Sequence, residues 1–208
     1  MRKIDVGTLN LSIDHKAKVL QALNSNRLSY GPMTEEFEKK ISSLHNNKYG
    51  VFTNSGTSAL QASIHALKIL NDWTDGDEII IPAVTFVATY NVVLQNNLKP
   101  VLVDISLEDL NIDTGLIESK ITDRTRAIMP VHLLGKPADM QKILKIAKKH
   151  KLKVIEDSCE TLFMTGIGHG DVTCFSFYVA HLLVTGVGGM ACTNDPKLAE
   201  LIRSLIFR

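Results

Sequence analysis

Three groups of side chains in this sequence have the types and spacing that chemistry at a bound ligand requires. The first is the segment TNSGTSAL, in which Gly56, Thr57 and Ser58 lie between a short apolar run and a helical pattern. Free N–H groups at the start of a helix, together with hydroxyl groups, suit an anion such as phosphate. An ordinary Ser/Thr helix cap would give the same pattern.

The second group consists of carboxylates at the end of the apolar run VIED. Glu156 and Asp157 close this run, and Glu160 follows shortly after it. A carboxylate at the end of a buried strand either neutralises a cationic group of a ligand or is a solvated loop charge. The pattern is equally compatible with both interpretations.

The third group lies in the segment SFYVAHLLVTGVGG. Ser176 falls inside a predicted strand, His181 follows that strand, and a glycine-rich turn comes next. A histidine takes up and releases protons near neutral pH, so it suits general acid–base catalysis. A lone histidine beside apolar residues is also a common hydrogen-bonded structural residue.

Alternating strand and helix patterns must position these groups. Strands are expected at 49–54, 77–82, 99–105, 126–134, 153–157, 174–178 and 188–194, and helices at 55–70, 85–97, 137–150 and 196–207. Two further helices are expected within 12–46, where Gly31 and Pro32 separate them and Thr34 is the expected N-cap of the second. Apolar strands alternating with helices predict one three-layer α/β/α domain with a mainly parallel, mixed sheet.

The last expected helix carries one apolar face, made by Leu198, Leu201, Ile202 and Leu205. We expect this face to be buried, either on this domain or on a second copy of the chain. No glycine or proline stops the helix before Arg208. The sequence therefore reads as a chain that is cut before the protein ends.

Composition excludes several classes of protein. The chain has 208 residues, 22% of them charged, and a net charge of +1 with scattered lysine and arginine, so no nucleic acid partner is expected. The longest apolar run, IIIPAVTFVAT, is too short to span a membrane and contains a proline. The N-terminus has no signal-peptide pattern. Three cysteines without CxxC spacing indicate free thiols in the cytoplasm and no metal site.

The order and spacing of the motifs resemble the DegT/DnrJ/StrS family of pyridoxal-phosphate (PLP) enzymes, which act on nucleotide-linked keto sugars. The resemblance covers nearly the whole chain and rests on YGPMTEEFE, NSGTSAL, GDEIIIPAVTFVAT, KPVLVDI, NID, PVHLLGKPADM, VIEDSCE and SFYVAHLLVTGVGGMACTND. It implies the large, PLP-binding domain of a fold-type-I enzyme over residues 1–208, with an N-terminal helical segment at about 1–46. The C-terminal small domain of the family is absent, and a homodimer is expected.

The resemblance also implies roles for the candidate residues around the cofactor. Gly56, Thr57, Ser58 and Ser176 would hold the cofactor phosphate.

The cofactor ring would have three further partners. Phe86 would stack on the pyridine ring, and Asp157 would pair with the ring nitrogen and keep it protonated. Glu160 stands where the aminotransferases usually have a glutamine near the ring hydroxyl.

His181 stands where aminotransferases of the family have the lysine that forms a Schiff base with the cofactor. No lysine lies between Lys153 and Lys197, and an imidazole is not a primary amine. One branch of the family makes this replacement: the 3-dehydratases of 4-keto-6-deoxy nucleotide sugars, which hold the cofactor non-covalently as pyridoxamine phosphate (PMP). The resemblance therefore favours 3-dehydration, with His181 as the acid and base.

Two departures from the dehydratase pattern keep alternatives open. Leu182 stands where a second histidine is common, and Val187 replaces a glutamate in the glycine turn. The alternatives are a sugar aminotransferase that takes its amino group from a donor such as glutamate, and a catalytically silent binding or assembly subunit. One dehydratase type carries an iron–sulfur cluster on cysteines that would lie beyond Arg208.

Overall fold

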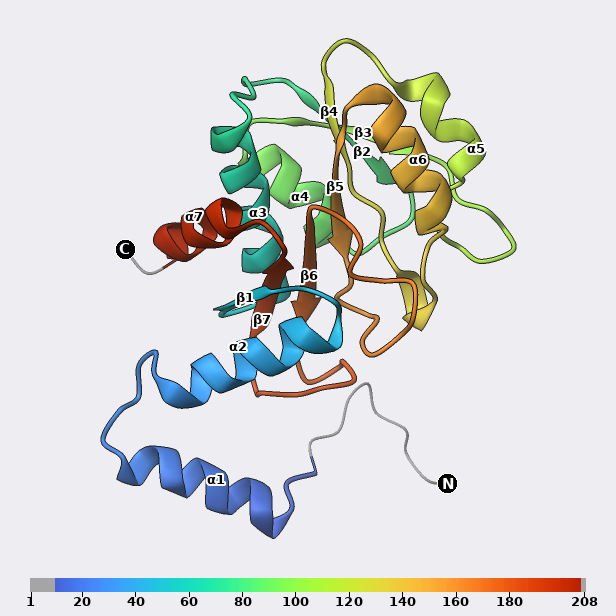
Figure 1. The fold of residues 1–208 in the computed structure, drawn as a ribbon. Helices are drawn as coiled ribbons and strands as arrows, with labels where there is room; N and C mark the ends of the chain where they lie inside the picture. The colour runs from blue at the N-terminus through green and yellow to red at the C-terminus, as the bar shows by residue number, and fades with distance from the viewer. Residues whose placement is uncertain (1–9, 207–208) are drawn as a thin grey trace.

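The computed structural model describes residues 10–206, so residues 1–9 of the expected N-terminal segment and residues 207–208 of the last helix lie outside the described residues. The described chain forms seven strands and seven α-helices (Figure 1). The strands are β1 (Tyr49–Thr53), β2 (Glu78–Pro82), β3 (Lys99–Val103), β4 (Thr125–Ile128), β5 (Lys153–Asp157), β6 (Val172–Ser176) and β7 (Gly189–Thr193). The α-helices are α1 (Ile13–Asn24), α2 (Pro32–Leu44), α3 (Gly56–Leu70), α4 (Val87–Gln95), α5 (Thr114–Ile117), α6 (Met140–His150) and α7 (Pro196–Ile206).

All seven strands join one sheet in the order β1-β7-β6-β5-β4-β2-β3. The strand pairs from β6 to β3 are parallel, whereas β7 runs antiparallel to both β1 and β6. The prediction of a mainly parallel, mixed sheet is confirmed. Because β7 is antiparallel to both neighbours, β1 has the same direction as β5 and β6, and the carboxyl ends of these three strands share one edge of the sheet.

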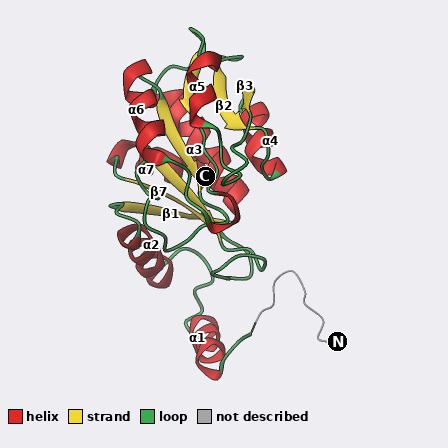
Figure 2. Cartoon of the chain, turned by 90° about the vertical axis from the view of Figure 1, so that its right-hand side faces the viewer, coloured by secondary structure: helices red, strands yellow, loops and turns green. Residues whose placement is uncertain are grey.

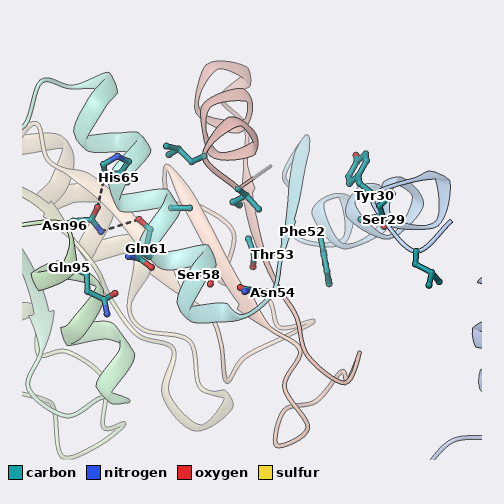
Figure 3. Close-up of a pocket in the computed structure, with 15 residues that line it drawn as sticks. Ser29, Tyr30, Phe52, Thr53, Asn54, Ser58, Gln61, His65, Gln95 and Asn96 are labelled. Carbon is teal, nitrogen blue, oxygen red and sulfur yellow. Dashed lines mark hydrogen bonds between the residues drawn. The ribbon is translucent and has the colours of Figure 1, made fainter. Parts of the chain in front are cut away.

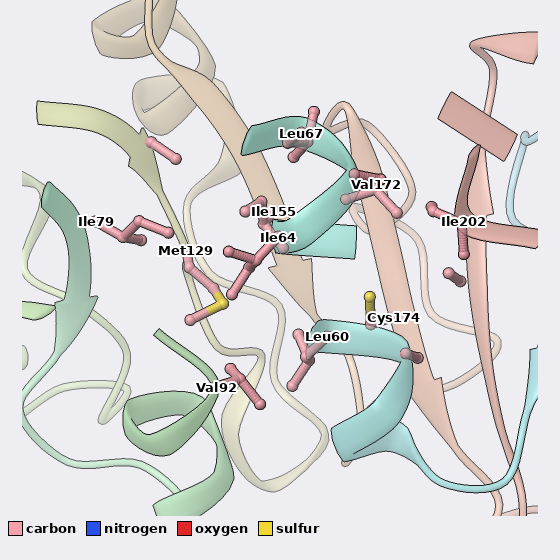
Figure 4. Close-up of a cluster of buried hydrophobic side chains, with 14 of the residues drawn as sticks. Leu60, Ile64, Leu67, Ile79, Val92, Met129, Ile155, Val172, Cys174 and Ile202 are labelled. Carbon is pink, nitrogen blue, oxygen red and sulfur yellow. The ribbon is translucent and has the colours of Figure 1, made fainter. Parts of the chain in front are cut away.

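Helices cover both faces of the sheet, as Figure 2 shows from the side. Successive strand residues point to opposite faces. Ile79 and Ile81 of β2 therefore belong to the same buried cluster as residues of α3, α4 and α7, whereas Ile80 belongs to a cluster with residues of α6. The first of these cores is centred on α3, whose Leu60 and Ile64 are fully buried (Figure 4). The three-layer arrangement expected from the sequence is confirmed.

The first and last helices differ in how they meet this body. Leu198 and Ile202 of α7 are buried in the first core, and Leu201 and Leu205 pack against it. The apolar face of α7 is thus buried on this domain, which was one of the two expected locations. In contrast, no residue of α1 is buried, and α1 lies away from the sheet in both Figure 1 and Figure 2.

The prediction that Thr34 caps α2 was wrong. The N-cap residue is Gly31, and Pro32 is the first helical residue. Proline is favoured at that position because its fixed φ suits a helix and its missing N–H needs no partner there.

The strand expected at 126–134 is shorter than predicted. It ends at Ile128, because Pro130 has no N–H for the ladder and Leu134 adopts a left-handed φ of 53°. The short helix α5, which Asp113 caps through the N–H of Gly115, was not predicted, since one turn leaves no periodic signal. None of the helices within residues 10–206 is long and apolar enough to cross a membrane.

Candidate active site

A cavity of about 570 Å³ lies at the sheet edge where β1, β5 and β6 end. Ligands of open α/β sheets bind beyond this edge. The lining residues are Ser55, Gly56, Thr57, Leu60, Phe86, Ala88, Val131, Leu133, Asp157, Cys159, Glu160, Ser176, Tyr178, Ala180 and His181. The candidate residues named from the sequence thus border one cavity, with the exceptions of Ser58 and Glu156.

The first turn of α3 forms one wall of the cavity. Ser55 caps this helix: its hydroxyl accepts the N–H of Ser58 at 3.1 Å, and its carbonyl accepts the N–H of Ala59 at 3.1 Å. The N–H groups of Gly56 and Thr57 come too early in the helix to meet a helical carbonyl. The segment is therefore a serine cap that also leaves two N–H groups available to an anion.

Two glycines allow this turn to pack against the neighbouring strands. A Cβ atom on Gly56 would lie 2.6 Å from Sγ of Cys159 and 2.8 Å from Cβ of Ser176, and one on Gly189 would overlap the carbonyl group of Ser55. Side chains larger than hydrogen do not fit at these contacts. The close packing brings Ser176 to the same cavity wall as the helix terminus.

Ser58 lies on the other side of the turn. Its hydroxyl bonds to the Ser55 hydroxyl at 3.0 Å and borders a second cavity of about 780 Å³, between α3, α4, the end of α7 and the segment before α2 (Figure 3). In that cavity Asn96 bonds to Nδ1 of His65 at 3.2 Å. Because Ser55 already accepts the N–H of Ser58, the N–H groups at this turn that remain for a ligand are those of Gly56 and Thr57.

Asp157 ends β5 and presents its carboxylate to the cavity, although the residue is only 4% exposed. Its Oδ1 accepts the N–H of Cys159 at 3.2 Å, and its Oδ2 accepts the hydroxyl of Thr89 at 2.8 Å. Thr89 was not identified from the sequence. Its place three residues after Phe86, on the same face of α4, is the signal that identifies it.

Phe86 is the N-cap residue of α4 and borders the cavity with a side chain that is 66% exposed. Its ring is therefore available to a flat ligand. Glu160, also at the cavity, is fixed by the N–H of Leu134, which donates to Oε2 at 2.8 Å.

The three cysteines are unpaired, as expected. Burial and, second, the charge of Asp157 hold the pKa of the Cys159 thiol well above its usual range. The Cys159 thiol at the cavity wall is therefore neutral and is not a ready nucleophile.

His181 lies in the segment between β6 and β7. Its backbone N–H donates to the carbonyl of Tyr178 at 2.9 Å, and the two rings meet edge to face with centroids 6.3 Å apart. The N–H of Phe177 donates to the Gly188 carbonyl at 2.9 Å and closes the segment into a loop. The half-buried imidazole borders the cavity, and no lysine is among the described residues that do so.

Glu156 points away from the cavity, on the opposite face of β5 from Asp157. It is fully buried and accepts hydrogen bonds from Nε2 of His132 at 2.8 Å, the N–H groups of Gly168 (2.9 Å), His169 (2.6 Å) and Gly170, and the Thr173 hydroxyl at 3.2 Å. Burial alone would raise the pKa of Glu156, but the hydrogen bonds from His132 and the glycine N–H groups lower it overall. The sequence did not reveal this network.

Residues 11–207 of the chain match the DegT/DnrJ/EryC1/StrS aminotransferase family. The chain belongs to this family. It is 40% identical to the 3-oxo-glucose-6-phosphate:glutamate aminotransferase of Bacillus subtilis, over 86% of this chain and 40% of that protein. It is 35% identical to the dTDP-4-dehydro-2,6-dideoxy-D-glucose 3-dehydratase of Saccharopolyspora spinosa, over 94% of this chain and 44% of that protein.

The fold agrees with this membership of the DegT/DnrJ/EryC1/StrS family. The solved structure of E. coli GDP-4-keto-6-deoxy-D-mannose-3-dehydratase with bound hydrated PLP matches with a TM-score of 0.91 at 29% identity, covering 97% of this chain and 54% of that chain. The predicted fold-type-I architecture is confirmed. The chain spans about half the length of the curated relatives it matches.

The cavity fits the cofactor of this family, which solved relatives hold as PLP or PMP. Gly56 and Thr57 supply N–H donors for a phosphate at a helix N-terminus. Asp157 supplies an acceptor for a cationic ring nitrogen, and Phe86 supplies an aromatic face. The donor set is therefore that of an anionic, aromatic ligand with one positive group.

Proposed function

We propose that this chain forms the cofactor-binding part of an enzyme that removes the C3 hydroxyl of a nucleotide-linked 4-keto-6-deoxy sugar as water. The observation that carries this proposal is the presence of His181, and of no lysine, among the described residues at the cavity. Without a primary amine at this wall, the cofactor is held only by non-covalent contacts. The free thiols are in keeping with a protein of the cytoplasm.

When bound, the cofactor supplies an amine that condenses with a ketone and a ring that accepts electrons. The chain supplies the contacts that hold and orient it: Gly56, Thr57 and Ser176 toward the phosphate, Phe86 along the ring, and Asp157 toward the ring nitrogen. Asp157 keeps the proton on that nitrogen.

Two further cavity residues act at the other side of the ring. His181 moves a proton at the carbon that joins the amine to the ring, as general base and then as acid. Glu160, fixed by the N–H of Leu134, would face the ring hydroxyl.

A sugar aminotransferase is the second candidate. A relative named as a glutamate-dependent aminotransferase is 40% identical to this chain, and Leu182 and Val187 depart from the dehydratase pattern. The two reactions differ in products, because transfer of an amino group from glutamate leaves 2-oxoglutarate, whereas dehydration releases water.

A homodimer is part of the proposal. Apolar side chains are exposed beside the cavity, and they include Phe86, Leu134, Tyr178, Leu182 and Val187. A second copy of the chain would cover this surface and complete the site. Sedimentation at micromolar concentration measures whether the chain dimerises.

Borohydride tests the role of His181, because it fixes a cofactor that is bonded to a lysine. We expect denatured, borohydride-treated protein to release all of its PLP, and His181→Lys to retain PLP covalently and to lose dehydration. His181→Asn, which has neither an amine nor a proton-transferring group, serves as the control. Mass spectrometry reads the attachment, and stoichiometric covalent PLP on the unmodified chain would contradict the proposal.

A further inference from the structure

Two threonines stand behind the carboxylate of Asp157. The hydroxyl of Thr89, a fully buried residue, lies 2.8 Å from Oδ2 of Asp157, and the hydroxyl of Thr85 lies 2.7 Å from that of Thr89. The three groups form a continuous line from the loop before α4, through α4, to the end of β5.

The direction of these hydrogen bonds follows from proton counting. An ionised carboxylate only accepts, and each hydroxyl has a single proton to donate. Thr89 therefore gives its proton to Asp157, and Thr85 must give its own to Thr89. The donor order is therefore Thr85 to Thr89 to Asp157.

The line also determines where Asp157 can bind a ligand. Thr89 takes a site on Oδ2, and the N–H of Cys159 takes a site on Oδ1 at 3.2 Å. Linked hydroxyls strengthen one another. These contacts fix the carboxylate and leave it acceptor capacity, and Asp157 borders the cavity.

The helix α4 carries both the aromatic residue Phe86 and the threonine that holds Asp157. Phe86 caps the helix, and Thr89 lies three residues later, in its first turn. The helix therefore fixes the aromatic ring and the carboxylate relative to each other, which suits a flat ligand whose cationic N–H lies in the ring plane.

We propose that Thr85 and Thr89 are positioning residues that hold the Asp157 carboxylate turned toward the ring nitrogen of the cofactor. This inference rests on the proposed function. It assigns a purpose to two residues that do not need to touch the cofactor.

The test uses PMP with ¹⁵N in its ring, titrated into the protein at constant pH. We expect Thr89→Val to weaken PMP binding by about tenfold or more, since a hydrogen bond to a charged group is lost. The ¹⁵N resonance of bound PMP should move toward the unprotonated position. Thr89→Ser, which keeps the hydroxyl, should restore both values, and Thr85→Val should show a smaller change in the same direction.

Thr193→Val is the matched control, because it removes an equally buried threonine hydroxyl that bonds to the Asp171 carbonyl, away from the cavity. It should leave the affinity and the ¹⁵N resonance unchanged. Normal binding and a normal resonance in Thr89→Val, or a Thr89→Ser variant as impaired as Thr89→Val, would overturn this inference alone. Failure of the unmodified chain to bind PMP would overturn the proposed function together with it.

Discussion

Glu156 and Asp157 are adjacent in the sequence and end the same strand, yet the protein uses their carboxylates in opposite ways. Glu156 accepts five hydrogen bonds from groups of the described chain. Asp157 accepts two. A carboxylate offers about four lone-pair sites. Glu156 therefore has no capacity left for a ligand, whereas Asp157 keeps sites that face the cavity.

The comparison teaches that hydrogen-bond saturation, and not burial or charge, separates a structural carboxylate from a binding one. Both residues are less than 5% exposed. His132 completes the structural side: its Nδ1 accepts the N–H of Ala138 at 3.0 Å, so its single ring proton lies on Nε2 and points to Glu156. The Glu156 network joins β5 to the 168–170 loop, whereas Asp157 joins β5 to α4 and, in our proposal, to the cofactor.

Removal of the saturated carboxylate should have the largest effect. We expect Glu156→Ala to lower the free energy of unfolding by about 3–5 kcal/mol, because it leaves the buried His132 ring and the buried N–H of Gly168 without an acceptor and removes the acceptor of two part-buried N–H groups. Urea denaturation measures this change. Glu118→Ala, at an exposed carboxylate that pairs with Lys149, is the control and should unfold near the midpoint of the unmodified protein. An unchanged midpoint for Glu156→Ala would refute the structural role.

Asp157→Asn should show the opposite pattern. The side chain keeps its shape and loses the charge that a cationic ring nitrogen needs, so PMP affinity should fall by about 10- to 100-fold. The free energy of unfolding should change by less than about 1 kcal/mol. Calorimetric titration and urea denaturation give the two values. The comparison fails if PMP binds Asp157→Asn as it binds the unmodified protein.

The smallest expected effect of the Asp157 carboxylate is on the reactivity of the Cys159 thiol. Because burial and the nearby charge of Asp157 raise the pKa of this thiol, its reactive thiolate forms only at higher pH than in a free cysteine. At pH 8, iodoacetamide should alkylate Cys159 at least about tenfold more slowly than N-acetylcysteine. Asp157→Asn should speed the reaction by a few-fold, as peptide mass spectrometry would show. An equal alkylation rate in Asp157→Asn and in the unmodified protein would mean that the Asp157 charge does not affect the pKa of the thiol.

The sequence predicted most of the fold because its signals are local. The alternation of apolar strands and helices predicted the sheet. The rule that ligands bind beyond the carboxyl ends of strands predicted that Gly56, Asp157 and Ser176 lie at one edge. The wrong prediction for the N-cap of α2 also came from a local signal. Thr34 was chosen because a threonine before acidic residues resembles an N-cap more than a glycine does.

The contacts within the site could not be predicted in the same way. Thr89 and Asp157 are 68 residues apart, and His132 and Glu156 are 24 residues apart. Such pairs depend on side-chain geometry across strands and helices, which periodicity does not encode. For the same reason the sequence could not distinguish Glu156 from Asp157, since their difference lies in the number of donors that distant segments bring to each.

The position of β7 has a consequence for synthesis on the ribosome. β1 lies at the edge of the sheet, and its strand partner is β7, with Tyr49 opposite Thr193 and Thr53 opposite Gly189. Translation at about 5–20 residues per second separates the two strands by on the order of ten seconds. During that interval β1 has no partner, and the turn at Gly56 lacks the Gly189 backbone against which it packs. The proposed anion site is therefore among the last parts of this domain to form, and a nascent chain stalled before β7 exposes an unpaired strand to its neighbours.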